Sequence, residues 1–280
     1  MDSMRRSPGE TPSTTHASPI LPAERPLTLV EHALRDDRVT VLVLLILTPV
    51  FSWWWIVVMA RDMYGPMTGP SAWIMTTSWD APHLLLLWAM WSVMMAAMML
   101  PSAAPLILLY GAAARRSPQP TSRRNTYALA AGYLAAWAAF SLAATALQRA
   151  LASLLFISPM MEAGSSRVSA TLLILAGIYQ WTPLKHACLR ACQSPLGFMM
   201  ARWRDGWSGA FRLGLDHGVY CVGCCWALML LLFAGGVMNL VVIAALAAWV
   251  AFEKLAPFGR RSAEVSGALM IAGGLWMLTR

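Results

Sequence analysis

Charged residues are scarce in this 280-residue chain. Only 12% of the residues are Asp, Glu, Lys or Arg, whereas 58% are hydrophobic. So few charges exclude an ordinary soluble domain and are typical of an integral membrane protein. The formal net charge of +8 comes largely from basic residues in short segments between apolar runs. That distribution favours membrane orientation over nucleic-acid binding.

Two kinds of functional segment are also missing. The chain has no glycine-rich nucleotide-binding loop, so any transport would be passive, ion-coupled or driven by a partner. It has no recognisable secretory signal, because the first apolar run begins near Val39 and no cleavage site follows it closely. Residues 1–38 contain five prolines among Ser, Thr and charged residues. This composition predicts a disordered cytoplasmic tail.

Beyond the tail, residues 39–280 alternate between long apolar runs and short polar breaks. About 20 apolar residues are needed to cross roughly 30 Å of hydrocarbon. The pattern therefore predicts one all-α domain, a polytopic membrane helix bundle in the cell's inner membrane with the lipid bilayer as a partner. We expect about seven spans, with six as the alternative, because the last two runs are short. The runs lie near 39–60, 84–110, 126–148, 169–190, 212–234, 237–253 and 263–279.

Basic residues in alternate loops predict the orientation of these spans. Four arginines lie between the second and third runs with no acidic residue among them, and further basic residues follow runs four and six. Loops rich in Lys and Arg face the cytoplasm. We therefore expect a cytoplasmic N-terminus. The end of run four and the start of run five would then lie at the cytoplasmic face.

One group of cysteines lies in the fifth run. On a helix, His217, Cys221, Cys224 and Cys225 fall within an arc of about 100°. An imidazole in a membrane span is unfavourable without a partner, which makes it a functional candidate. Three thiols and an imidazole on one face predict a soft-metal site. The alternative is that these small apolar cysteines only pack against a neighbouring helix.

The other two cysteines, Cys188 and Cys192, lie four residues apart at the end of the fourth run. If runs four and five are neighbours, both cysteine groups lie at a similar depth and can meet. A position near the cytoplasm favours reduced thiols over a structural disulfide. On a continuous helix, His186 points about 160° away from the face of these two cysteines. Periodicity alone therefore makes it a weaker candidate ligand.

Methionine adds a second kind of soft sulfur donor in the second run. Met90, Met94 and Met98 fall within an arc of about 80° on a helix. Thiolates and thioethers select Cu(I), whereas zinc accepts Cys and His equally well. The methionines favour copper, with Met94 and Met98 as candidate ligands. The alternative is that they are flexible apolar packing residues.

Three longer motifs accompany these residues. They are MMAAMMLPSAAP at 94–105, YQWTPLKHACLR at 179–190 and GLDHGVYCVGCCW at 214–226. With them, the chain from about 80 to 275 resembles a bacterial family of predicted metal-binding integral membrane proteins, essentially a domain of unknown function. The resemblance implies metal binding through the Cys and His motifs, and it adds weight to His186 as a ligand. It implies no reaction, substrate or transported species.

Two classes of function follow. The first is a membrane protein that binds Cu(I), or alternatively zinc, through a Met ladder and a Cys/His site near the cytoplasmic face. It would transport the ion or transfer it to a metallochaperone or a cuproenzyme assembly partner. The second is a membrane thiol–disulfide oxidoreductase in which Cys221 and Cys224 cycle between dithiol and disulfide. We favour the first, non-enzymatic role because no obvious quinone or flavin site accompanies the cysteines. A structural subunit whose cysteines only pack is a weaker third possibility.

Overall fold

The structure, a computed structural model, describes residues 37–65, 80–115, 122–154 and 164–280. Nine α-helices and no strands lie within these ranges, which confirms the all-α prediction. The predicted tail, residues 1–38, lies outside them except for its last two residues, with which the first helix begins. The helices are α2 (Asp37–Met63), α4 (Ala81–Ala114), α5 (Ser122–Ser153), α6 (Ser166–Gln180), α7 (Pro183–Gln193), α8 (Pro195–Arg202), α9 (Gly206–Gly235), α10 (Leu240–Leu255) and α11 (Gly259–Leu278).

Four of these helices, α2, α4, α5 and α9, are long and apolar enough to cross a membrane by length and composition. This finding is consistent with a membrane protein. Four is fewer than the seven spans, or six, that the sequence predicts, although every predicted apolar run does form helix in the described residues. The predicted orientation of the N-terminus stays a prediction.

Local features of the chain explain why three of the seven predicted spans do not form helices long and apolar enough to cross a membrane. The fourth run is divided between α6 and α7, because Trp181 ends α6 and the Thr182 side chain accepts a hydrogen bond from the Lys185 N–H to cap α7. The proline at position 183 occupies the first turn of α7, where its missing N–H is tolerated. The 16 residues of α10 extend only about 24 Å at 1.5 Å per residue. Three charged residues near the start of α11 leave it less apolar.

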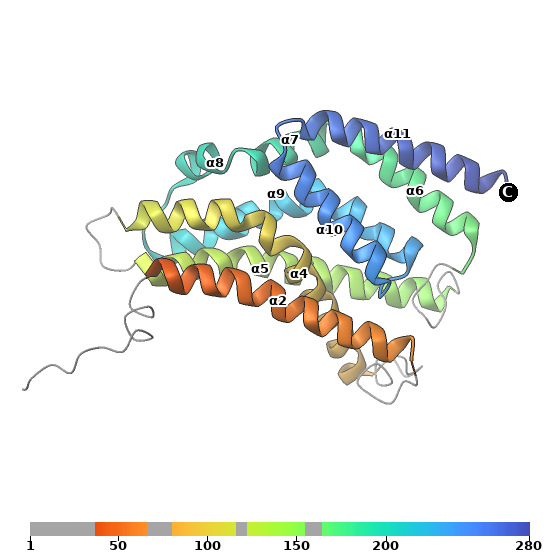
Figure 1. The fold of residues 1–280 in the computed structure, drawn as a ribbon, viewed down its shortest axis with the longest axis horizontal. Helices are drawn as coiled ribbons and strands as arrows, with labels where there is room; N and C mark the ends of the chain where they lie inside the picture. The colour runs from red at the N-terminus through yellow and green to blue at the C-terminus, as the bar shows by residue number, and fades with distance from the viewer. Residues whose placement is uncertain (1–36, 66–79, 116–121, 155–163) are drawn as a thin grey trace, which may run out of the picture.

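The helices form two groups that meet at α9 (Figure 1). In one group α2 packs on α4, α4 on α5, and α5 along α9; in the other, α6 lies beside α11 and also contacts α9. Helix α10 contacts α4, α9 and α11. The short helix α8 lies near the end of the bundle where α4 ends and α5 begins, and α7, which lies between α8 and the start of α11, packs against α9. Helix α9 is therefore the central element, and it carries three of the five cysteines.

Glycines allow α5 and α9 to approach until their backbones touch. A Cβ atom on Gly214 would lie 1.9 Å from the carbonyl oxygen of Leu129, and one on Gly132 would lie 2.0 Å from that of Phe211. Small residues at helix interfaces permit such contacts. One helical turn beyond Gly214, the α9 face that holds His217 and Cys221 packs against Tyr133 of α5.

We expect Gly214→Ala to destabilise the protein by about 1–3 kcal/mol, because the added methyl group must force α5 and α9 apart. Thermal unfolding of the purified protein in detergent would measure the loss. Gly273→Ala in α11 is the matched control, since a Cβ at that position meets nothing within 4 Å. If both variants unfold at the wild-type temperature, the α5–α9 contact is less close than described.

Candidate functional site

Four thiols gather where α7 packs against α9. The Sγ atom of Cys192 lies 3.9 Å from that of Cys224, and the Cys224 and Cys225 Sγ atoms are 3.1 Å apart. Side-chain interactions link Cys221 to these three residues. We call Cys192, Cys221, Cys224 and Cys225 the thiol cluster. All four are free thiols. One member of the first cysteine group, Cys192, therefore lies beside the second group.

The cluster is buried on its α9 side. Cys221, Cys224 and Cys225 are each only 1% exposed, because the helical repeat places all three on one face of α9 and that face packs inside the bundle. Cys192, on α7, is half-buried. The thiol group of Cys224 also donates a hydrogen bond to the carbonyl oxygen of Cys221, at 3.1 Å. Cys192 is therefore the cluster member nearest to the surface.

Cys221 has two polar neighbours from other helices. The Tyr133 hydroxyl of α5 lies 3.0 Å from its Sγ atom and donates to the carbonyl oxygen of Met99 in α4. The Nζ atom of Lys254, near the end of α10, donates to Cys221 Sγ at 2.8 Å. Lys254 also donates to Ser102 Oγ at 3.1 Å and approaches the Met99 Sδ atom at 3.8 Å. These contacts connect α4, α5, α9 and α10 at one point.

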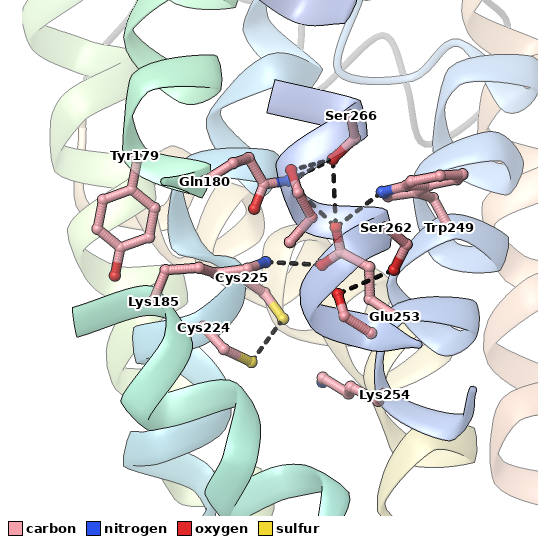
Figure 2. Close-up of polar contacts among 12 residues, drawn as sticks. Tyr179, Gln180, Lys185, Cys224, Cys225, Trp249, Glu253, Lys254, Ser262 and Ser266 are labelled. Carbon is pink, nitrogen blue, oxygen red and sulfur yellow. Dashed lines mark hydrogen bonds and ion pairs between the residues drawn. The ribbon is translucent and has the colours of Figure 1, made fainter. Parts of the chain in front are cut away.

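A buried ion pair lies next to the cluster (Figure 2). Lys185 of α7 donates to the Glu253 carboxylate of α10 at 2.7 Å, and both side chains are at most 1% exposed. The same carboxylate accepts from Trp249 at 2.9 Å, and from the Gln180 and Ser266 side chains at 3.2 and 3.4 Å. Figure 2 shows these donors around Glu253, with the Cys224 and Cys225 sulfur atoms facing each other nearby. The network joins α6, α7, α10 and α11.

His217 is buried one turn before Cys221. Its ring lies 5.8 Å from that of Tyr133 and 5.1 Å from that of Phe198, which belongs to α8. Its Nδ1 atom is buried and has no hydrogen-bond partner in the part of the chain that the structure describes. A buried polar atom without a partner is unfavourable. A ligand bound to this nitrogen would remove that cost. His217 therefore keeps its place as a candidate beside the thiol cluster.

Cys188 and His186, also on α7, lie in different surroundings. The Cys188 sulfur packs against Gly223 of α9, where an added Cβ would lie 2.7 Å away. His186 lines an open surface pocket together with Trp181, which ends α6, and with Arg260 and other residues of α11. This position agrees with the helical phase that turns His186 away from the cysteine face. The assignment of His186 and Cys188 as ligands stays a prediction, with no contact between His186 and the cluster to support it.

The methionines of α4 are buried along the helix, including Met94 and Met98. The sulfur that the structure brings next to the Cys221 and Lys254 contact is that of Met99. Met99 is one residue from Met98 and therefore faces about 100° away from it, outside the arc of the predicted ladder. Sequence reasoning missed it, although Met95 and Met99 form a second pair at helical spacing. The roles of Met94 and Met98 stay predictions.

The donor atoms are of the chemical type that binds a soft cation, but their positions do not form a complete coordination shell. No three His, Cys, Asp or Glu side chains in the described ranges already form a group that could hold a metal ion. Sulfur atoms bonded at about 2.3 Å to a tetrahedral metal would lie about 3.8 Å apart. The Cys192–Cys224 distance of 3.9 Å matches that value, whereas the 3.1 Å between Cys224 and Cys225 is shorter. A small side-chain rotation is needed before Cys225 can share an ion with Cys224.

Comparison with known proteins gives one match. A family model described as copper chaperone, PpoB2, matches residues 88–277. The match covers α5 to α10 completely and most of α4 and α11, and it includes every cysteine. No curated protein matches the chain, and no solved structure does.

We expect Lys185→Met to destabilise the protein by about 3–5 kcal/mol, because it leaves the Glu253 carboxylate buried without its cation. Chemical denaturation of the purified protein would measure the loss. The double variant Lys185→Met with Glu253→Gln removes both charges and should recover most of the stability. Equal losses in the single and double variants would show that the pair is not coupled.

Proposed function

The chain belongs to the PpoB2 copper chaperone family, and on that premise we propose that it binds Cu(I) at the thiol cluster and transfers the ion to an acceptor protein. The acceptor is a cuproenzyme in assembly or a metallochaperone that serves one. The observation that carries the proposal is the 3.9 Å approach of Cys192 Sγ to Cys224 Sγ between two different helices, with two more thiols beside them. Two helices thus supply soft donors to one small volume.

The donor set favours Cu(I) over zinc. Thiolates and thioethers are soft ligands that suit Cu(I), and the Met99 sulfur lies within reach of the same contact network. Among the residues that the structure describes, the one buried carboxylate near the cluster is that of Glu253, and it is occupied by Lys185 and three neutral donors. Zinc remains the alternative, because Cys192, Cys221 and Cys224 with the His217 imidazole would also make a common zinc ligand set.

The proposal also includes the location of the protein in the lipid bilayer. Four helices with the length and apolar character of membrane spans support an integral membrane protein. We propose that it is a multi-pass protein of the inner membrane with a cytoplasmic N-terminus. The arginine-rich segment that joins α4 to α5 would then face the cytoplasm. The half-buried Cys192 lies on α7, and we propose that the acceptor approaches the cluster at this residue.

Transfer would proceed by exchange of sulfur ligands. An acceptor thiolate approaches the cluster at Cys192 and forms a bond to Cu(I), and the Cys192 sulfur leaves the ion and takes up a proton. The acceptor then replaces the remaining sulfur ligand in the same way. Copper keeps its oxidation state throughout, so the transfer needs no oxidant or reductant. The thiols of the cluster would then all be free, as the structure describes them.

We expect the purified protein, loaded with Cu(I) under anaerobic reducing conditions, to retain about one copper ion per chain. Cys221→Ser and Cys224→Ser should each remove most of it, because each removes a sulfur donor from the cluster. Elemental analysis after desalting gives the copper-to-protein ratio, and the same measurement after exposure to Zn(II) tests the alternative metal.

Cys188→Ser is the matched control, since Cys188 lies on α7 as Cys192 does but its sulfur packs against Gly223. It should retain wild-type copper. Protein that binds neither metal and isolates with a stable Cys221–Cys224 disulfide would overturn the proposal in favour of a thiol–disulfide oxidoreductase. Protein that binds neither metal and keeps all its thiols reduced would leave only packing for the cysteines.

A further inference from the structure

Three charged side chains are buried among the residues that the structure describes, and their charges do not cancel. Lys185, Glu253 and Lys254 are 0%, 1% and 5% exposed. The two cations and one anion leave one positive charge in excess. A buried charge without a counter-charge is strongly unfavourable. One of the two lysines must therefore find its negative partner in something other than a carboxylate.

Lys254 is the lysine without a carboxylate. One Glu253 oxygen accepts from Lys185, and the other accepts from Trp249, Gln180 and Ser266. Glu253 and Lys254 are adjacent in sequence, but their side chains diverge in Figure 2. The Lys254 Nζ atom instead lies 2.8 Å from Cys221 Sγ, with a hydroxyl and a thioether as its other neighbours.

Resting on the proposed copper site, we propose that Lys254 is the counter-cation of a Cu(I) ion held by two thiolates, one of them Cys221. Each of the two thiols releases its proton to water when it binds the ion, and copper stays Cu(I). Two thiolates and one Cu(I) carry a net charge of −1, which the ammonium group of Lys254 balances. The occupied site is then neutral within the bundle.

The same balance limits the number of thiolates. A third thiolate on Cu(I) would leave an uncompensated negative charge in an interior that disfavours it. Any further ligand should therefore be neutral, and the Met99 thioether and the His217 imidazole are the neutral donors nearby. Lys254 thereby sets the charge of the bound complex without contacting the ion itself. It is a positioning residue rather than a ligand.

The test measures Cu(I) affinity of the full chain in detergent, by anaerobic competition with a chromophoric Cu(I) chelator. Lys254→Leu removes the charge and adds no donor atom for copper, so its affinity should fall at least about tenfold. Lys254→Arg keeps the charge and should stay within about threefold of wild type. Ser102→Ala removes a neutral partner of the amine and should also change the affinity by less than about threefold. Unchanged or tighter binding by Lys254→Leu would overturn the inference.

A second measurement needs no variant, so it decides the matter even if Lys254→Leu does not fold. X-ray absorption at the copper edge of the wild-type protein should show two thiolate sulfur ligands. Three or four thiolates would contradict the charge balance while leaving the copper site intact. Wild-type protein that binds no Cu(I) would instead refute the proposed function on which the inference rests.

Discussion

A charge in an apolar helix bundle needs a partner of opposite sign, and helix α10 buries two charged residues next to each other in the sequence. Glu253 faces α6, α7 and α11, where Lys185 neutralises it and three neutral donors fill its second oxygen. Lys254 faces α4 and α9, where Cys221 is its closest partner. The two side chains thus tie opposite groups of helices to α10. The thiol cluster lies between these two connections, so the same charges that hold the bundle together also set the electrostatics of the site.

Close packing provides the second constraint. Because Gly214 lets the α9 backbone touch that of Leu129, Tyr133 comes near enough for its hydroxyl to reach both Cys221 and the Met99 carbonyl. The phenol group therefore spans three helices. Close packing and charge therefore meet at the Cys221 sulfur atom, which contacts the Tyr133 hydroxyl on one side and the Lys254 ammonium group on another. No other thiol of the cluster has polar neighbours from two further helices among the contacts described above.

The sequence predicted what depends on helical periodicity within one segment. The shared face of Cys221, Cys224 and Cys225 and the separate direction of His186 both follow from 100° per residue, and the structure agrees with both. Lys254, Tyr133 and Met99 were not identified because they come from three other helices, and their convergence depends on tertiary packing. The span count was too high because hydropathy alone does not register the break at Trp181–Thr182, where a side-chain cap starts a new helix.

On the proposed function, the thiol cluster must both hold Cu(I) and release it, and its four thiols differ in burial in a way that suits both tasks. Three thiols sit on one long helix, almost fully buried, where solvent and competing ligands have little access. The fourth, Cys192, sits half-buried near the end of the 11-residue helix α7, which is bounded by its Thr182 cap and by Ser194. Ligand exchange needs only one accessible position at a time, so an acceptor can begin at Cys192 without opening α9. On the proposed function, the uneven burial of the four thiols would give the transfer a direction, from the buried thiols of α9 toward Cys192 on α7.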